Sequence, residues 1–473
     1  MKLYKFKFFF NSHKKLLTVI AIIVPLITVG AVFVTPPVIS AIQHNMAVNR
    51  FHNMSRETML EDFDYLMEAL EDSWPFFNLS VSANDVDVRG LADNMRVLIM
   101  DHDVEIDGPH GFLDLLREHF IWPIDQLGHL RAIWQYRDFF DSLYGSVREF
   151  EWGVQHGFEF IFDSSGMNLE FLTRPEVAMF YQTLRDAGGS DLIPEGAGTQ
   201  TGHTSVLEVD ILEEGSIAYL NINRMIHMWW DPRGAGARMG RYEAVLYNFY
   251  NNIKGFDHLI IDLRGNPGGM SLHFDVFVAG PLLAESITFP GYVFFKGGQY
   301  SSDVMENFDP RAFGLNMQLE RMAAEFVEPL PYMDRNIDFE HAFTSEYKIY
   351  AGHYYSEWFA SMGDEVAFDG KIWVLTDERT ASAAEAAAAI FKYTNIATIV
   401  GEETRGIMGT MYDATSALIS LPNTGIILRF DVAYFTNPYG RALQGYGVMP
   451  HYFKQEGLDA LETVLRMIGE GNY

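Results

Sequence analysis

Hydrophobic and polar positions follow two different patterns in the two halves of the chain. After about residue 204, short apolar stretches alternate with helical stretches in the manner of an α/β protein. The pattern predicts strands at 206–212, 217–222, 258–262, 371–376 and 396–400, helices at 241–254 and 383–393, and a hairpin formed by 417–421 and 426–433. Residues 270–370 read as mixed helix and aromatic-rich loop.

The residues before 204 show helical spacing instead. Apolar positions recur three and four residues apart after residue 58, and residues 111–135 continue as helix with an interruption near Pro123. We therefore expect a mostly helical region at 55–203, followed by an α/β core at 204–473. Residues 137–204 contain no glycine-rich carboxylate-binding loop, so no PDZ module is expected there.

A long apolar stretch lies near the N-terminus. Residues 16–34 carry no charged side chain, and five lysines and no acidic residue precede them. Such a run can cross about 30 Å of hydrocarbon, and the lysines favour a cytoplasmic tail. The pattern predicts a basic tail at 1–15, a transmembrane anchor at 16–34, a linker at 35–54, and the remainder outside the cell. A cleaved signal peptide is the alternative, although its apolar region is usually shorter, about 7–15 residues.

Composition excludes several classes of function. The chain has 63 acidic and 34 basic residues, a formal charge of −29 that repels nucleic acid. It has no cysteine, which excludes disulfides, thiolate metal sites and a cysteine nucleophile. Residues 103–114 match part of a calcium-binding loop, but Pro109 and His110 fit that loop poorly. No metal or cofactor is expected.

Two strands end in turns suited to acyl transfer. The first turn reads Asp-Leu-Arg-Gly-Asn-Pro-Gly-Gly (262–269), and the second reads Thr-Ala-Ser-Ala-Ala-Glu (380–385). Ser382 at the start of a helix is a candidate nucleophile, since helix N–H groups stabilise developing negative charge. The alternative is structural, because Ser382 and Glu385 also match a helix capping box. The Gly-x-Ser-x-Gly elbow of α/β-hydrolases is absent.

Backbone N–H groups in these turns are candidates for binding an oxyanion. We expect the N–H groups of Gly268 and Ala383 to form the oxyanion hole, and Gly269 and Glu385 to contact substrate. Asp262 and Arg264 can pair and stiffen the first turn. Together these features predict a serine hydrolase.

These motifs resemble a known family of serine peptidases. The motifs at 262–269 and 380–385 are followed in order by Gly-Glu-Glu-Thr-Arg-Gly (401–406) and Leu-Gln-Gly-Tyr-Gly-Val-Met-Pro (443–450). The chain is similar to the family that includes the carboxyl-terminal processing (tail-specific) peptidases, the tricorn protease core and the interphotoreceptor retinoid-binding repeats. Residues 127–131 extend the likeness into the helical region. The resemblance implies a crotonase/Clp-protease-like core of repeated strand-strand-helix units.

The resemblance also separates two branches of that family. The lysine of the Ser–Lys dyad in processing peptidases falls on Ile407 here, so such a dyad is excluded. The tricorn-like branch takes its general base from the helical region, and the matching residue is His129. His203 is a competing candidate. The glutamate that orients the base in tricorn-like relatives is replaced by Gln444, which can still accept a hydrogen bond. The alternative is that another carboxylate orients the histidine.

The sequence thus predicts a membrane-anchored extracellular serine peptidase that cleaves peptide bonds through an acyl-enzyme on Ser382. Its partners would be a peptide or protein substrate and, through the anchor, the membrane. Two alternatives stay open. One is a non-catalytic peptide- or lipid-binding protein on the same fold, motivated by Gln444 and the missing lysine. The other is a hydrolase of small esters.

Overall fold

The computed structural model describes residues 54–124, 127–133, 174–186, 207–225, 235–269, 271–307, 317–322, 330–333, 337–352, 367–408 and 415–471. Ser55–Tyr473 form one compact unit. No helix within the described ranges is both long and apolar enough to cross a membrane. The predicted tail, anchor and linker up to residue 53 lie outside those ranges, as do residues 137–173 and 187–204.

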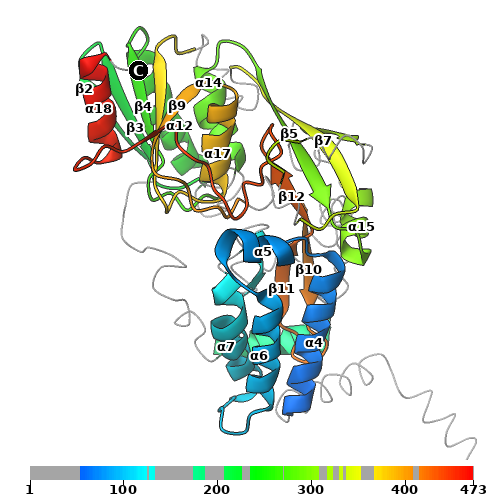
Figure 1. The fold of residues 1–473 in the computed structure, drawn as a ribbon. Helices are drawn as coiled ribbons and strands as arrows, with labels where there is room; N and C mark the ends of the chain where they lie inside the picture. Colours follow the sequence, from blue (N-terminus) through cyan, green and yellow to red (C-terminus); the bar gives the residue numbers. More distant parts are fainter. Residues whose placement is uncertain are drawn as a thin grey trace, which may run out of the picture. The chain divides into compact units, whose positions relative to one another are not determined.

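A six-stranded sheet forms the centre of the α/β part, with strand order β13-β9-β8-β4-β3-β2 (Figure 1). β2 and β3 pair antiparallel, and the other neighbours pair parallel. The strands predicted by sequence alternation are confirmed: β2 (Leu207–Glu213), β3 (Ile217–Ile222), β4 (His258–Asp262), β8 (Lys371–Thr376) and β9 (Ala397–Gly401), to which β13 (Tyr452–Phe453) adds an edge.

Helices cover both faces of this sheet, which explains why every residue of β4 is buried. α18 (Ala460–Glu470) packs Val464 and Met467 against Ile260 and Trp373 on one face. Figure 1 shows α18 on one side of the sheet and α17 (Ala383–Tyr393) on the other. The predicted helices at 241–254 and 383–393 are confirmed as α12 (Ala235–Asn252) and α17.

The helical region packs on strands from the far end of the chain. A three-stranded sheet of order β1-β11-β10 lies beside α4, α6 and α7 (Figure 1). Its predicted hairpin is confirmed as β10 and β11, while its third strand, β1, lies within the helical region of the sequence. The elements are α4 (Arg56–Ser73), α5 (Phe77–Asn84), α6 (Val88–Met100), α7 (Gly108–Leu116), α11 (Pro175–Asp186), β1 (Arg131–Ala132), β10 (Ser416–Ser420) and β11 (Ile427–Asp431).

The stretch 270–370 differs from the prediction of helix and loop. It contributes three strands to an antiparallel sheet of order β12-β5-β7-β6. β5 contains Pro290 and Gly291, which are weak strand formers and hide the strand pattern. Gly291 is required there because an added Cβ would lie 2.6 Å from the Thr436 carbonyl oxygen. The elements are α13 (Ser271–Phe274), α14 (Gly280–Leu282), β5 (Ile287–Phe295), α15 (Gln299–Asn307), β6 (Met317–Arg321), β7 (His341–Ile349) and β12 (Ala433–Thr436).

A buried carboxylate fastens α4 to the β10–β11 turn. Asp62 Oδ1 accepts hydrogen bonds from the Asn423 N–H at 2.8 Å and from its side-chain amide at 3.0 Å. Asp62 Oδ2 accepts from the Thr424 N–H and from its hydroxyl, both at 2.7 Å. Burial raises the pKa of Asp62, and these hydrogen bonds oppose the shift.

We expect Asp62→Asn to lower the free energy of unfolding by about 2 kcal/mol, because the new NH₂ group would face donors and leave them unpaired. Urea unfolding would measure the loss. Asp64→Asn is the matched control: Asp64 lies on the same helix, but it is exposed and pairs with Arg96 at 2.8 Å. Its effect should stay within about 0.5 kcal/mol. Equal losses in the two variants would contradict the fastening role of Asp62.

Candidate active site

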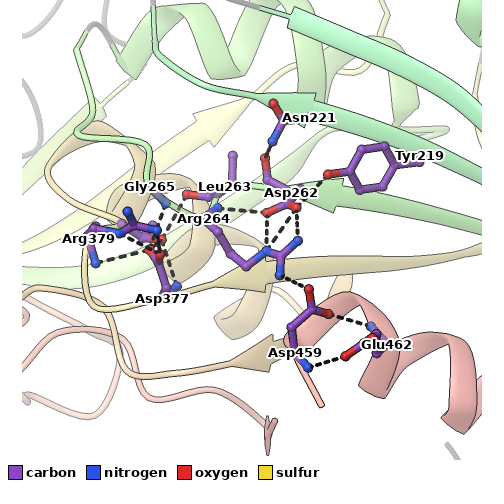
Figure 2. A network of polar contacts seen from close by, with 11 residues as sticks. Tyr219, Asn221, Asp262, Leu263, Arg264, Gly265, Asp377, Arg379, Asp459 and Glu462 are labelled. Atoms are coloured by element: carbon purple, nitrogen blue, oxygen red, sulfur yellow. Dashed lines mark hydrogen bonds and ion pairs between the residues drawn. The ribbon is translucent and has the colours of Figure 1, made fainter. Parts of the chain in front are cut away.

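The glycine-rich turn after β4 is held by a network of charged side chains (Figure 2). The predicted pair is confirmed, since Arg264 Nη2 donates to Asp262 Oδ2 at 2.6 Å. Arg264 also pairs with Asp459, the N-cap residue of α18, at 3.1 Å. The Tyr219 hydroxyl donates to the same Asp262 oxygen at 2.7 Å. These contacts hold the end of β4 in one conformation.

The turn after β8 is tied directly to the first. Asp377 Oδ1 accepts from the Gly265 N–H at 2.8 Å, and Arg379 donates to Asp377 Oδ2 (Figure 2). The Thr380 hydroxyl donates to the Leu263 carbonyl at 3.0 Å. Although burial works against ionisation, the bonds from Gly265 and Arg379 lower the pKa of Asp377. An ionised Asp377 therefore connects the two turns.

The second half of the first turn lies against the serine. Gly268 has φ +92°, and an added Cβ would lie 2.7 Å from Ser382 Cβ and 2.8 Å from the Ala383 nitrogen. Its N–H donates to Asn266 Oδ1 at 2.8 Å. The predicted oxyanion donor is therefore engaged inside its own turn. Gly269 has φ +134° and pairs with Met225, whose carbonyl oxygen leaves no room for a Cβ.

Ser382 adopts an unusual backbone conformation at the start of α17. Its φ of 51° and ψ of −120° are rare for a residue other than glycine, and its side chain is half-buried. The capping box that the sequence pattern suggests is present at this helix end. In it the Ser382 N–H donates to Glu385 Oε2 at 2.9 Å.

Glu385 lies inside the protein rather than at a substrate-facing surface. Its side chain is fully buried and accepts from the Thr404 hydroxyl and the Gly406 N–H, both at 2.6 Å, and from the Ile407 N–H at 3.0 Å. Burial raises the pKa of Glu385, and these hydrogen bonds oppose the shift. The residue that the sequence predicts as a substrate contact instead joins the Ser382 turn to residues 404–407.

His129 lies in a tight turn that its surroundings impose. The turn Leu127–His129 has φ 59° at Gly128 and 48° at His129. A Cβ on Gly128 would lie 2.4 Å from Trp74 Nε1 and 2.5 Å from Phe76, so only glycine fits there. The His129 side chain is about 10% exposed, and its Nδ1 lies 2.7 Å from Asp431 Oδ2.

Asp431, not Gln444, is the partner of the imidazole. β1 pairs antiparallel with β11, with Arg131 opposite Arg429. Continuing this register by two residues places His129 opposite Asp431. Gln444 is fully buried, and neither its amide oxygen nor its amide nitrogen bonds a described residue. The expectation that Gln444 orients the histidine is therefore corrected.

The sequence did contain a signal for Asp431. Arg429 and Asp431 stand two residues apart in an otherwise apolar strand, and charged groups in such a strand must be paired if they are buried. The competing base His203 lies outside the described residues. Among the residues that the structure describes, no group of three or more acidic or histidine side chains could hold a metal ion.

A cavity of 220 Å³ lies between the Leu127 turn and residues 405–407. Leu127 lines it, together with Gly406 and Ile407, whose N–H groups are bonded to Glu385. The rest of its lining is Asn84, Val86, Pro123 and Arg405. Ser382 and His129 themselves are not among its lining residues.

We expect Gly268→Ala to destabilise the protein by about 2 kcal/mol or more, since the new methyl group would push into the Ser382 turn at a positive φ. Gly255→Ala is the matched control, because Gly255 has φ +83° but nothing within 4 Å of an added Cβ. The difference between the two losses in thermal or urea unfolding isolates the contact with Ser382. Equal losses would contradict that contact.

Comparison with known proteins places this arrangement in a family. The sequence model of Peptidase family S41 matches residues 216–453. Solved structures that resemble the chain include a protein described as a peptidase from Parabacteroides merdae, at 16% identity over 88% of this chain and 97% of that one, with a TM-score of 0.45. Mature CPAF in complex with lactacystin matches at 14% identity over 88% and 97%, with a TM-score of 0.47.

A third solved structure is the photosystem II D1 C-terminal processing protease, at 18% identity over 54% of this chain and 47% of that one, with a TM-score of 0.28. The family match spans half of the chain and includes both turns, Ser382, Asp431 and Gln444, while His129 precedes it. On this match the protein belongs to peptidase family S41 and is a serine-type peptidase.

Proposed function

We propose that this peptidase cleaves peptide bonds through an acyl-enzyme on Ser382, with His129 as the general base. The observation that carries the proposal is the buried contact of 2.7 Å between His129 Nδ1 and Asp431 Oδ2. A carboxylate can only accept a hydrogen bond, so Nδ1 carries the proton and Nε2 is left as the basic nitrogen. This is the tautomer that a general base requires.

The chemistry follows from these roles. Nε2 of His129 would take the proton of the Ser382 hydroxyl as the oxygen attacks the substrate carbonyl carbon. The resulting imidazolium is stabilised by Asp431 and then gives its proton to the leaving amine, which breaks the peptide bond. A water molecule, deprotonated by the same nitrogen, would then hydrolyse the acyl-enzyme and restore the serine.

The developing oxyanion has one well-supported donor. Ala383 is the first residue of α17, and the first N–H groups of a helix have no acceptor within it. Its N–H therefore supports the oxyanion, assisted by the positive end of the helix dipole. The Gly268 N–H contributes only if substrate displaces its bond to Asn266.

We further propose that the core repeats strand-strand-helix units in the crotonase/Clp-protease manner, and that residues 16–34 anchor the protein in the cell membrane with the peptidase region outside. The uncharged run and the preceding lysines support the anchor. Carbonate extraction of membranes and protease accessibility on intact cells would test it. Release of the full-length chain by carbonate would contradict the anchor.

A fluorophosphonate probe should label wild-type protein on Ser382, and Ser382→Ala should remove the label completely. Asp431→Asn should slow labelling on the order of 10²–10⁴-fold, because an asparagine no longer fixes the reactive tautomer. Gel-based labelling and peptide mapping would measure both effects. Absence of labelling in folded wild-type protein at neutral pH would contradict the proposed mechanism.

The same experiment separates the alternatives. The binding-protein alternative was motivated by Gln444 and by the missing lysine, and the contact of Asp431 with His129 weakens the first of these grounds. Saturable binding of a peptide or lipid without probe labelling or cleavage would favour that alternative. Hydrolysis of short esters without hydrolysis of any peptide in a mixed library would favour the esterase.

A further inference from the structure

Behind Asp431 lies a second layer of polar side chains on the same hairpin. The Ser416 hydroxyl lies 2.6 Å from Asp431 Oδ1, the oxygen that does not face the histidine. Arg429 reaches the same hydroxyl oxygen with Nη2 at 2.8 Å and Nε at 3.1 Å. His129, Asp431, Ser416 and Arg429 therefore form a continuous chain of contacts, which we call the hairpin relay.

Strand pairing explains why these four residues meet. Ser416 on β10 stands directly opposite Asp431 on β11. Arg429 and Asp431 are two residues apart on β11, so their side chains leave the same face of the sheet. β1 pairs on the other side of β11 and brings His129 to Asp431. The hairpin relay thus joins residues from β10, from β11 and from the turn before β1, which are neighbours in one small sheet.

The direction of each hydrogen bond follows from counting protons. A guanidinium has only donors, so Ser416 Oγ must accept from Arg429. The hydroxyl has a single proton, and the remaining partner is Asp431, which must therefore accept it. Asp431 thus receives hydrogen bonds on both oxygens, one from Ser416 and one from His129. Hydrogen bonds on both oxygens fix the plane of the carboxylate.

Because these side chains are buried, the arrangement of their hydrogen bonds affects their energy. Arg429 and Ser416 are 4% and 3% exposed, and Asp431 is fully buried. A charge in such surroundings is costly unless it has an opposite charge or good hydrogen bonds nearby. Here the cation and the carboxylate share one hydroxyl, so the positive charge of Arg429 acts on Asp431 through Ser416.

We propose that Ser416 and Arg429 are positioning residues of this peptidase, which act through Asp431 to hold His129 in its reactive tautomer and orientation. The inference rests on the proposed function of Ser382 and His129. In this proposal the β10–β11 hairpin orients His129, a role that the sequence pattern suggested for Gln444. Neither Ser416 nor Arg429 touches the reacting atoms.

The hairpin provides matched controls. Ser420 lies four residues after Ser416 on β10, is equally buried, and accepts a hydrogen bond from Arg174 at 3.0 Å. Arg174 also donates to the Pro422 carbonyl. In this second serine–arginine pair, Ser420 lies on the same hairpin, whereas Arg174 directly precedes α11, and neither side chain is bonded to Asp431. Ser420→Ala and Arg174→Gln therefore measure the structural cost of losing such a pair.

The test measures the rate constant of fluorophosphonate inactivation separately from the apparent affinity for the probe. Ser416→Ala and Arg429→Gln should each lower the rate constant about tenfold, with the affinity unchanged, because the base is misoriented while the binding surface stays intact. Ser420→Ala and Arg174→Gln should keep the wild-type rate constant. Ser416→Thr, which keeps the hydroxyl, should recover most of the rate.

A double-mutant cycle separates positioning from a general loss of structure. In the Asp431→Asn background, Ser416→Ala should cause no further decrease in rate, because both act through the same carboxylate. Melting temperatures identify any variant that fails to fold, and the Thr variant then carries the test. Wild-type rate constants in folded Ser416→Ala and Arg429→Gln would overturn the inference. Missing label in wild-type protein would instead overturn the proposed function.

Discussion

The parallel pairing of β4 with β8 is the constraint on which the serine half of the site depends. Parallel strands end at the same edge of a sheet, so the turns at 263–269 and 377–382 emerge side by side. Asp377 and Thr380 then join the turns through hydrogen bonds to Gly265 and Leu263. Each turn thus fixes the other, and the backbone of Gly268 comes into contact with Ser382. A side chain on Gly268 would break this arrangement.

The strained conformation of Ser382 needs a compensating interaction, and Glu385 supplies it. A non-glycine residue in a sparsely populated backbone region costs about 1–3 kcal/mol. The Glu385 carboxyl group offsets that cost by accepting a hydrogen bond from the Ser382 N–H. It also accepts hydrogen bonds from the N–H groups of Gly406 and Ile407. One buried side chain is therefore bonded both to the Ser382 turn and to residues that line the neighbouring cavity.

The position of His129 depends on antiparallel strand pairing and on a glycine turn. His129 and Asp431 are 302 residues apart in the chain, and only the pairing of β1 with β11 brings them together. Gly128 allows the turn because Trp74 and Phe76 fill the space that a side chain would need. The carboxylate that contacts the imidazole belongs to Asp431. A glutamine at position 444 is therefore compatible with an oriented histidine.

Local pattern was enough to determine the strands of the large sheet, the β10–β11 hairpin and the helix after Ser382. Alternation and turn residues act over a few positions and are visible in a single sequence. Motif spacing likewise identified the family and selected Ser382 and His129 as candidates. In residues 287–349, β5 was missed because Pro290 and Gly291 hide its pattern. Pairing of β5 with β12 and β7, and of β7 with β6, makes these segments strands.

Only the tertiary structure decided which polar groups meet. Asp431 was chosen as the histidine partner by strand register, and Glu385 was drawn inside because three backbone and one hydroxyl donor converge on it. The engagement of the Gly268 N–H by Asn266 is likewise a matter of turn geometry. Hydrogen-bond partners hundreds of residues apart depend on how strands pair and which donors remain unpaired after packing. A linear pattern of residue types does not contain that information.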